Sequence, residues 1–309
     1  MGAKAFFAKG WPTRWAFYLG KFFPPRAGNF VASTAARMLV SLKPDVYHVA
    51  KANLRHVLGQ DATEEVLHQT TYRLFRQAAR SYYELFNNIG SGRVDVTQFE
   101  PPVRLSSEAE LYLTEALSSG RGVFIAASHM ANFDLAGVAL GQLMPVPLQV
   151  LSLAEPEPGY EIFNQLREEG GTLLTPISPA SLRSAMRRLK EGGAVITGVD
   201  RPIGEGDELV EFFGAPARMP FGYIRIPLRT DCLVVTATAR YTNGEYQIIA
   251  NPPMEMIHTG DRAHDQKVNV QRILAQLENF IRQQPDQWMM FVPVWVGEQA
   301  GYPQNLLIS

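Results

Sequence analysis

The chain has 309 residues, 46% of them hydrophobic and 19% charged, and this globular composition excludes a disordered or collagen-like protein. Lysine and arginine total 29 against 30 acidic residues, so the chain lacks the basic excess of a dedicated nucleic-acid-binding protein. The single cysteine, Cys232, cannot form an internal disulfide or a zinc site built from several cysteines, and it fits a reducing compartment.

The N-terminal segment is basic and rich in aromatic residues. Before Asp45 the sequence carries seven lysines and arginines and nine aromatic residues, and it contains no acid. Cations interrupt every apolar run, so we expect no secretory signal but a segment that lies in the plane of an anionic membrane surface. The alternative is a helix docked on the rest of the protein. Residues 135–154 are uncharged, but Pro145 and Pro147 predict a buried helix and a strand there, with no membrane span.

The pattern of apolar residues changes near residue 100. Apolar spacing before this point predicts helices near residues 49–58 and 63–86. A glycine-rich break at residues 90–92 and then Pro101-Pro102 mark the boundary. We therefore expect an N-terminal helical, membrane-associating region over residues 1–100 and an α/β domain over residues 101–309.

The second region alternates short apolar runs with amphipathic stretches. The predicted strands are residues 122–127, 147–153, 172–177 and 194–199, and the predicted helices are residues 133–144, 160–169 and 179–190. A hairpin is expected over residues 233–250, with a helix near residues 265–284 after it. This alternation predicts an α/β fold with a mostly parallel central sheet flanked by helices. Cys232 opens the hairpin's first apolar strand, so we expect a structural thiol.

His129 is the strongest candidate for chemistry. The sequence has no GxSxG elbow, Walker A loop or HExxH pair, and the other histidines lack metal-ligand spacing. His129 directly follows a predicted strand, where α/β sheets build their sites, and Asp134 would lie in the first turn of the next helix. An aspartate folded back onto the imidazole would fix its tautomer and make it a general base for an alcohol. The alternative is a purely structural His–Asp contact.

Further sequence blocks accompany this His-x4-Asp spacing. In chain order they are Asn53-Leu54, the HMANFD of residues 129–134, the QLREEG of residues 165–170, Asp200-Arg201-Pro202, the EFFGAPARMPFG of residues 211–222 and the IRQQPDQW of residues 281–288. As a set spanning roughly residues 12 to 295, they resemble the HX4D/E lysophospholipid and glycolipid acyltransferases. The resemblance is to the branch of the late lipid A biosynthesis acyltransferases and phosphatidylinositol mannoside acyltransferases.

The resemblance implies a glycerolipid acyltransferase-like fold. It further implies transfer of a fatty acyl group from acyl-CoA or acyl carrier protein to a hydroxyl of a lysophospholipid or glycolipid. His129 would be the general base and Asp134 its orienting partner, with no metal and no cofactor besides the thioester donor. Backbone N–H groups after His129 or near Phe213-Gly214 would stabilise the oxyanion. The expected substrate-binding residues are Asn132, Arg167, Asp200, Arg201, Glu208 and Glu211.

The implied partners are membrane lipids and the thioester donor, at the cytoplasmic face of the cell membrane as a peripheral protein. Ala131 stands where the family usually has glycine, and residues 289–295 lack the family's usual basic residue, which argues against a phosphorylated lipid A-type acceptor. An acyl-thioester hydrolase and a non-catalytic lipid- or thioester-binding protein of the same fold are the alternatives. The acceptor, the acyl chain length, the choice between CoA and carrier protein and the oligomeric state stay open. The arginines at positions 183, 187 and 188 are expected on a solvated helix face.

Overall fold

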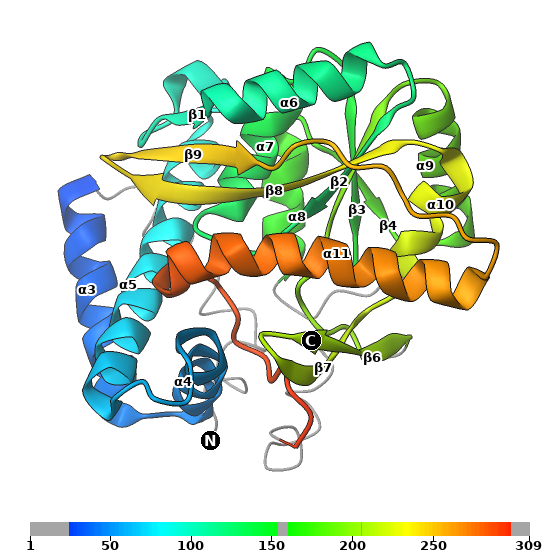
Figure 1. Cartoon of the computed structure of the whole chain (residues 1–309). Helices are drawn as coiled ribbons and strands as arrows, with labels where there is room; N and C mark the ends of the chain where they lie inside the picture. Colours follow the sequence, from blue (N-terminus) through cyan, green and yellow to red (C-terminus); the bar gives the residue numbers. More distant parts are fainter. Residues whose placement is uncertain (1–24, 154–159, 205, 298–309) are drawn as a thin grey trace.

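The computed structural model describes residues 25–153, 160–204 and 206–297 (Figure 1). Its centre is a seven-stranded sheet with the strand order β1-β9-β8-β2-β5-β3-β4. The strands are β1 (Val103–Leu105), β2 (Val123–Ala127), β3 (Leu148–Ser152), β4 (Leu173–Pro176), β5 (Ala194–Gly198), β8 (Leu233–Thr242) and β9 (Glu245–Ala250). Only the β8–β9 pair is antiparallel among the pairings of this sheet, so the predicted mostly parallel α/β sheet is confirmed.

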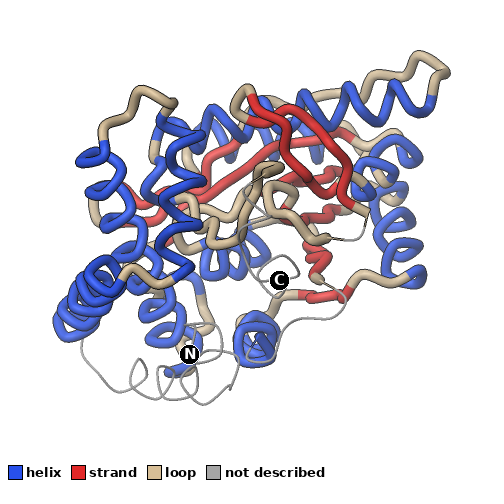
Figure 2. The backbone as a smooth tube through the Cα atoms, turned by 90° about the horizontal axis from the view of Figure 1, so that it is seen from below, coloured by secondary structure: helices blue, strands red, loops and turns tan. Residues whose placement is uncertain are grey.

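Helices cover both faces of this sheet (Figures 1 and 2). They are α6 (Ser107–Ser118), α7 (Phe133–Leu143) and α8 (Tyr160–Glu169) on one face, and α9 (Pro179–Lys190) and α11 (Arg262–Gln283) on the other. Of two short helical turns, η3 (Gly222–Arg225) packs against α11 and α10 (Pro227–Thr230) packs against α9. Alternating strand residues feed the two apolar cores, because Ile125 and Ile196 face the α7 side whereas Phe124 and Val195 face the α9 side.

The N-terminal part of the described chain is helical, as the sequence predicts. Its helices are α3 (Pro25–Leu42), α4 (Asp45–Leu58) and α5 (Glu64–Asn88), which enclose a third apolar core. The far end of α5 reaches the main sheet, where Leu85 and Phe86 join the core on the α7 side. The basic aromatic segment up to residue 24 lies outside the described residues. The boundary at residue 100 stays a prediction.

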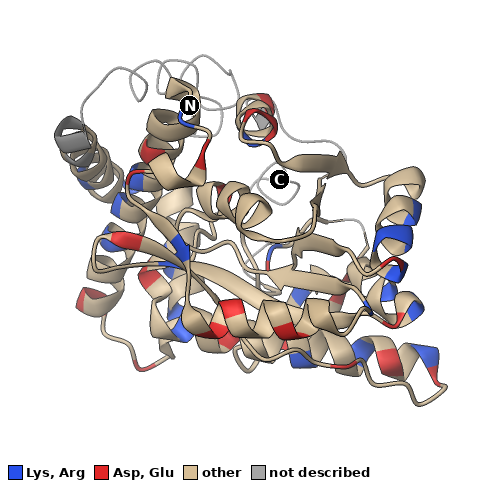
Figure 3. Ribbon diagram, turned by 90° about the horizontal axis from the view of Figure 1, so that it is seen from above, with Lys and Arg blue, Asp and Glu red and all other residues tan. Residues whose placement is uncertain are grey.

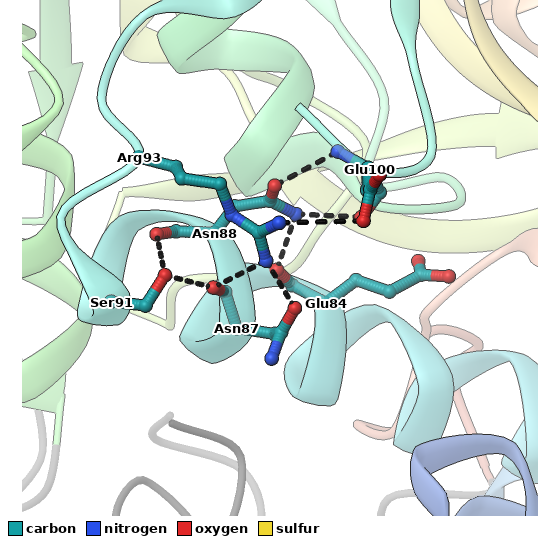
Figure 4. A network of polar contacts seen from close by, with 6 residues as sticks. All are labelled: Glu84, Asn87, Asn88, Ser91, Arg93 and Glu100. Carbon is teal, nitrogen blue, oxygen red and sulfur yellow. Dashed lines mark hydrogen bonds and ion pairs between the residues drawn. The ribbon is translucent and has the colours of Figure 1, made fainter. Parts of the chain in front are cut away.

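A polar network fixes the chain where α5 ends (Figure 4). The amide of Asn88 donates to the carbonyl oxygens of Glu84 and Glu100, and it accepts from the Glu100 N–H at 2.9 Å. Arg93 reaches back to Asn87 and forms an ion pair with Glu100. Side-chain hydrogen bonds and an ion pair therefore fix the connection between the helical region and the sheet.

Two regions differ from the elements read in the sequence. Residues 207–220 form a separate hairpin of β6 (Asp207–Phe212) and β7 (Ala215–Pro220), which packs on α11. Helix α6 also stands in a stretch for which we predicted no element, although Ser106 caps it by accepting from Ala109 N. No helix among the described residues is long and apolar enough to cross a bilayer.

Cys232 is buried beneath the start of β8 and belongs to the core on the α9 side. Burial raises the pKa of this thiol to about 11. A thiol that is both buried and protonated at neutral pH is a poor nucleophile. The structural role predicted for Cys232 fits this setting.

Glu84 should make the stability of the fold depend on pH. Burial raises its pKa to about 7, although Arg80 and hydrogen bonds from Tyr246 and Asn132 act in the opposite direction. Between its unfolded value of 4.5 and about 7, the folded chain holds a proton that the unfolded chain has lost. Stability therefore falls as pH rises through this window. We expect the unfolding free energy of the wild type to fall by about 2–3 kcal/mol relative to Glu84→Gln between about pH 5 and 8.

Urea unfolding at several pH values measures this difference. Glu115→Gln is the matched control, because Glu115 is exposed on α6 rather than buried. A wild type and Glu84→Gln pair with parallel pH profiles would contradict the assignment.

Candidate active site

His129 and Asp200 meet at the carboxyl edge of the sheet. Strands β2 and β5 are parallel neighbours, and their last residues, Ala127 and Gly198, lie directly opposite each other. His129 and Asp200 each follow two residues later, so the register itself brings them together. Nδ1 of His129 lies 2.6 Å from Oδ1 of Asp200, and the backbone N–H of His129 donates to Oδ2 at 2.9 Å. Asp200 thereby fixes both the ring and the backbone of the histidine.

Asp134 has a different partner from the one predicted. It is buried in the first turn of α7, where it accepts from Nε and from an Nη of Arg167 at 2.8 and 2.5 Å. The reason is geometric, because the N-terminal turn of α7 directs this carboxylate toward α8, and a buried carboxylate needs a counter-charge. The expected His129–Asp134 contact is therefore corrected to two separate pairs, His129–Asp200 and Asp134–Arg167.

A C-terminal segment holds the His129–Asp200 pair in place through hydrogen bonds. Trp288 is buried, and its indole Nε1 donates to Oδ2 of Asp200 at 2.8 Å. The neighbouring backbone holds the histidine turn, since Met289 N–H donates to the carbonyl of His129 and Ala131 N–H donates to that of Gln287. Ala131 has φ +50°, a left-handed conformation that favours glycine.

A cavity of about 550 Å³ opens beside His129. The imidazole keeps 21% of its surface exposed, whereas Asp200 is fully buried behind it. The walls come from strands β2 to β5, helices α7, α8 and α9 and the short turns η3 and α10, and they are largely apolar. The residues lining the apolar part include Phe133, Val138, Val150, Leu151, Leu174, Leu182, Met186 and Ile196. This volume and lining suit a small lipid-like or acyl ligand.

The structure places the other predicted residues in three different settings. Arg167 and Arg201 line the cavity. Asn132 is buried, where its amide caps α7 at Leu135 N and donates to the carbonyl of Ser81, so it does not line the cavity. Glu208 and Glu211 are exposed on β6, which is also outside the cavity lining. Neither glutamate therefore lies in the cavity beside His129.

Three of the backbone donors expected for an oxyanion are already engaged. Met130 N–H donates to Ser128 and Ala131 N–H to Gln287, while Phe213 N–H donates to the carboxylate of Glu278. These three groups are therefore not available in this structure to a tetrahedral intermediate. Among the described residues no cluster of three or more His, Cys, Asp or Glu side chains could hold a metal.

Several residues that shape the site gave only weak sequence signals. Gly198 faces the imidazole directly, because a Cβ built there would lie 2.4 Å from Cε1 of His129. Trp288 is the last residue of the IRQQPDQW block at residues 281–288, but nothing in the sequence assigned it a role. Arg225 and Arg229, on η3 and α10, line the cavity although nothing in their local sequence marks them.

The indole of Trp288 should act on the reaction only through Asp200. Replacing Trp288 with phenylalanine removes one of the two donors to Oδ2, and a hydrogen bond to a charged group contributes about 1.5–3 kcal/mol. We expect kcat to fall about tenfold to a hundredfold with little change in KM. Trp295→Phe is the matched control, because its equally buried indole donates to the backbone carbonyl of Phe212. Equal losses in both variants would show that only packing is at stake.

Comparison with known proteins adds an independent line. Phosphatidylinositol mannoside acyltransferase of Mycolicibacterium smegmatis is 24% identical over 190 residues, which cover 60% of this chain and 61% of that protein. The protein of the same description from Mycobacterium tuberculosis is 25% identical over 190 residues, which cover 60% of this chain and 58% of that protein. The matched stretch thus spans about three fifths of these relatives. Residues 11–296 match the family described as bacterial lipid A biosynthesis acyltransferase, and because this match covers most of the chain, the chain belongs to that family.

Proposed function

We propose that this protein is an O-acyltransferase that moves a fatty acyl group from a thioester, acyl-CoA or acyl carrier protein, to a hydroxyl of a lysophospholipid or glycolipid. The observation that carries the proposal is the His129–Asp200 pair at the edge of a largely apolar cavity. The family and the glycolipid-modifying names of the relatives support the reaction class. No metal and no further cofactor are needed for the chemistry.

The reaction follows from the position of the free imidazole nitrogen. With Nδ1–H held by Asp200, Nε2 is the acceptor and takes the proton of the acceptor hydroxyl as its oxygen attacks the thioester carbonyl carbon. The tetrahedral intermediate then collapses, the C–S bond breaks, and the leaving thiolate takes that proton back from the imidazolium. No acyl-enzyme is required, and the buried Cys232 could not supply one readily.

The Asp134–Arg167 pair has a supporting part in this scheme. Both side chains line the cavity, and their mutual ion pair ties the first turn of α7 to the last turn of α8. This contact holds the turn that carries His129 against the cavity wall. We therefore assign Asp134 the role of a positioning residue rather than that of the partner of the base.

Release of free thiol from acyl-CoA tests the function. Release that requires a lipid alcohol identifies a transferase, and release without the alcohol identifies a hydrolase. No release together with measurable binding identifies a non-catalytic protein. His129→Ala should lower the transfer rate by about 10²–10⁴-fold, since that is the usual contribution of a general base. A variant that folds and keeps more than about a tenth of the wild-type rate would remove His129 from this role.

The reaction is proposed to take place at the cytoplasmic membrane surface. Helix α3 buries Ala36 and Val40 against the other N-terminal helices but leaves an apolar stripe on its outer side. The stripe consists of Phe30, Val31, Met38 and Leu42, which are between 54% and 74% exposed. The basic and aromatic residues that precede α3 in the sequence are also of a kind that favours a membrane surface.

A triple variant, Phe30→Ser, Met38→Ser and Leu42→Ser, should bind anionic phospholipid vesicles about tenfold less tightly or worse, because each buried side chain contributes roughly 1.5–3 kcal/mol. Co-sedimentation with vesicles measures the change. Leu111→Ser is the matched control, since Leu111 is 61% exposed on α6, away from the N-terminal helices. The proposal of membrane docking by α3 fails if the triple variant sediments like the control.

A further inference from the structure

Two arginines line the cavity wall formed by η3 and α10. Arg225 ends η3 and Arg229 lies in α10, so they are four residues apart on consecutive helical turns and share one side. Both are exposed, and within the described residues neither makes an ion pair or a side-chain hydrogen bond. In Figure 3, several Lys and Arg positions, coloured blue on the ribbon, lie on the right, where Figure 1 places α9 and α10.

The cavity lining as a whole is positively charged. It contains four arginines, at positions 167, 201, 225 and 229, but Asp134 is its only carboxylate among the described residues. Arg167 already neutralises that carboxylate. Two like charges one helical turn apart also repel each other, and neither guanidinium has an ion-pair partner among the described residues. The wall is therefore suited to an anionic group supplied by a ligand.

Tyr223 provides a second, independent observation on the same wall. It lies on η3, two residues before Arg225, and it also lines the cavity. Its hydroxyl is buried and has no hydrogen-bond partner among the described residues, although its ring stacks against Phe124. A buried hydroxyl without a partner is energetically unfavourable, and a hydrogen bond to a ligand atom would relieve that cost.

We propose that Arg225, Arg229 and Tyr223 form a subsite for a phosphate group carried by a substrate of the acyl transfer. The inference rests on the proposed function for the identity of the substrate, but the site itself rests on the cavity lining. Guanidinium groups bind phosphate oxygens through paired, charge-assisted hydrogen bonds, and the tyrosine hydroxyl adds a neutral donor. The phosphate of a phosphopantetheine thioester and the phosphate of an anionic lipid acceptor share this chemistry.

Equilibrium titration with coenzyme A and with pantetheine, which lacks phosphate, tests the subsite. The double variant Arg225→Gln, Arg229→Gln should bind coenzyme A at least about tenfold more weakly, because it loses the charge-assisted hydrogen bonds from two guanidinium groups. Its affinity for pantetheine should stay unchanged. Tyr223→Phe should show a smaller loss of the same selectivity. Arg183→Gln is the matched control, because Arg183 is exposed on α9 and does not line the cavity.

The same variants titrated with lysophosphatidylinositol, against an uncharged lysolipid, separate the two sources of phosphate. A selective loss for coenzyme A assigns the subsite to the donor, and a selective loss for the phospholipid assigns it to the acceptor. Unchanged affinity for both phosphate-bearing probes would overturn the proposal. Because these titrations require no turnover, they stand apart from a failure of the proposed acyl transfer.

Discussion

Replacing Asp200 with asparagine is expected to lower kcat by about 10³–10⁴-fold while KM changes little. In Ser-His-Asp triads the same Asp→Asn change has an effect of this size, because it leaves the histidine in the wrong tautomer. The asparagine carbonyl oxygen can still accept from the His129 N–H and from the indole of Trp288, which meet the carboxylate at Oδ2. Its amide group would then face Nδ1 of His129 as a donor. The imidazole must respond by accepting at Nδ1 and holding its proton on Nε2, where a base needs a lone pair.

Asp134→Asn is the comparison that decides between the two carboxylates. It breaks the buried ion pair with Arg167, and leaving one partner unpaired typically costs about 3–5 kcal/mol of stability. The measurement is the initial transfer rate of each variant, normalised to folded protein, beside its melting temperature. We expect Asp200→Asn to lose mainly activity and Asp134→Asn to lose mainly stability. The reverse pattern would return the role of the histidine's partner to Asp134.

The sequence located both halves of the dyad without pairing them. His129 and Asp200 each follow a predicted strand, and that much is readable from apolar runs that end in polar residues. Their contact depends on strand order, because β5 is inserted between β2 and β3 although it follows both of them, and β4, along the chain. Apolar periodicity carries no information on which parallel strands are neighbours. Spacing along the chain therefore favoured the nearer acid, Asp134.

The missed hairpin has a local physical explanation. Strands β6 and β7 contain Pro216 and Pro220 and leave Glu208, Leu209 and Glu211 exposed, so their pattern resembles a loop more than a strand. Tertiary packing on α11 stabilises them instead. By contrast, α7 could be predicted together with its cap, because Asn132 combines a capping side chain with an apolar run after it. Local signals thus predicted the elements, and non-local contacts decided the site.

Gly198→Ala is expected to reduce kcat/KM by about a hundredfold without unfolding the protein, because displacing a catalytic group by about 1 Å can cost that much. The backbone at Gly198 is ordinary extended strand, which alanine adopts without strain. The added Cβ would lie 2.4 Å from Cε1 and 2.9 Å from Nε2 of His129, so the ring must move. Gly141→Ala is the control, since a Cβ there meets nothing within 4 Å. Gly141 also does not line the cavity. Melting curves and transfer rates of both variants measure the effect, and a fully active Gly198→Ala enzyme would mean that the imidazole does not work from this position.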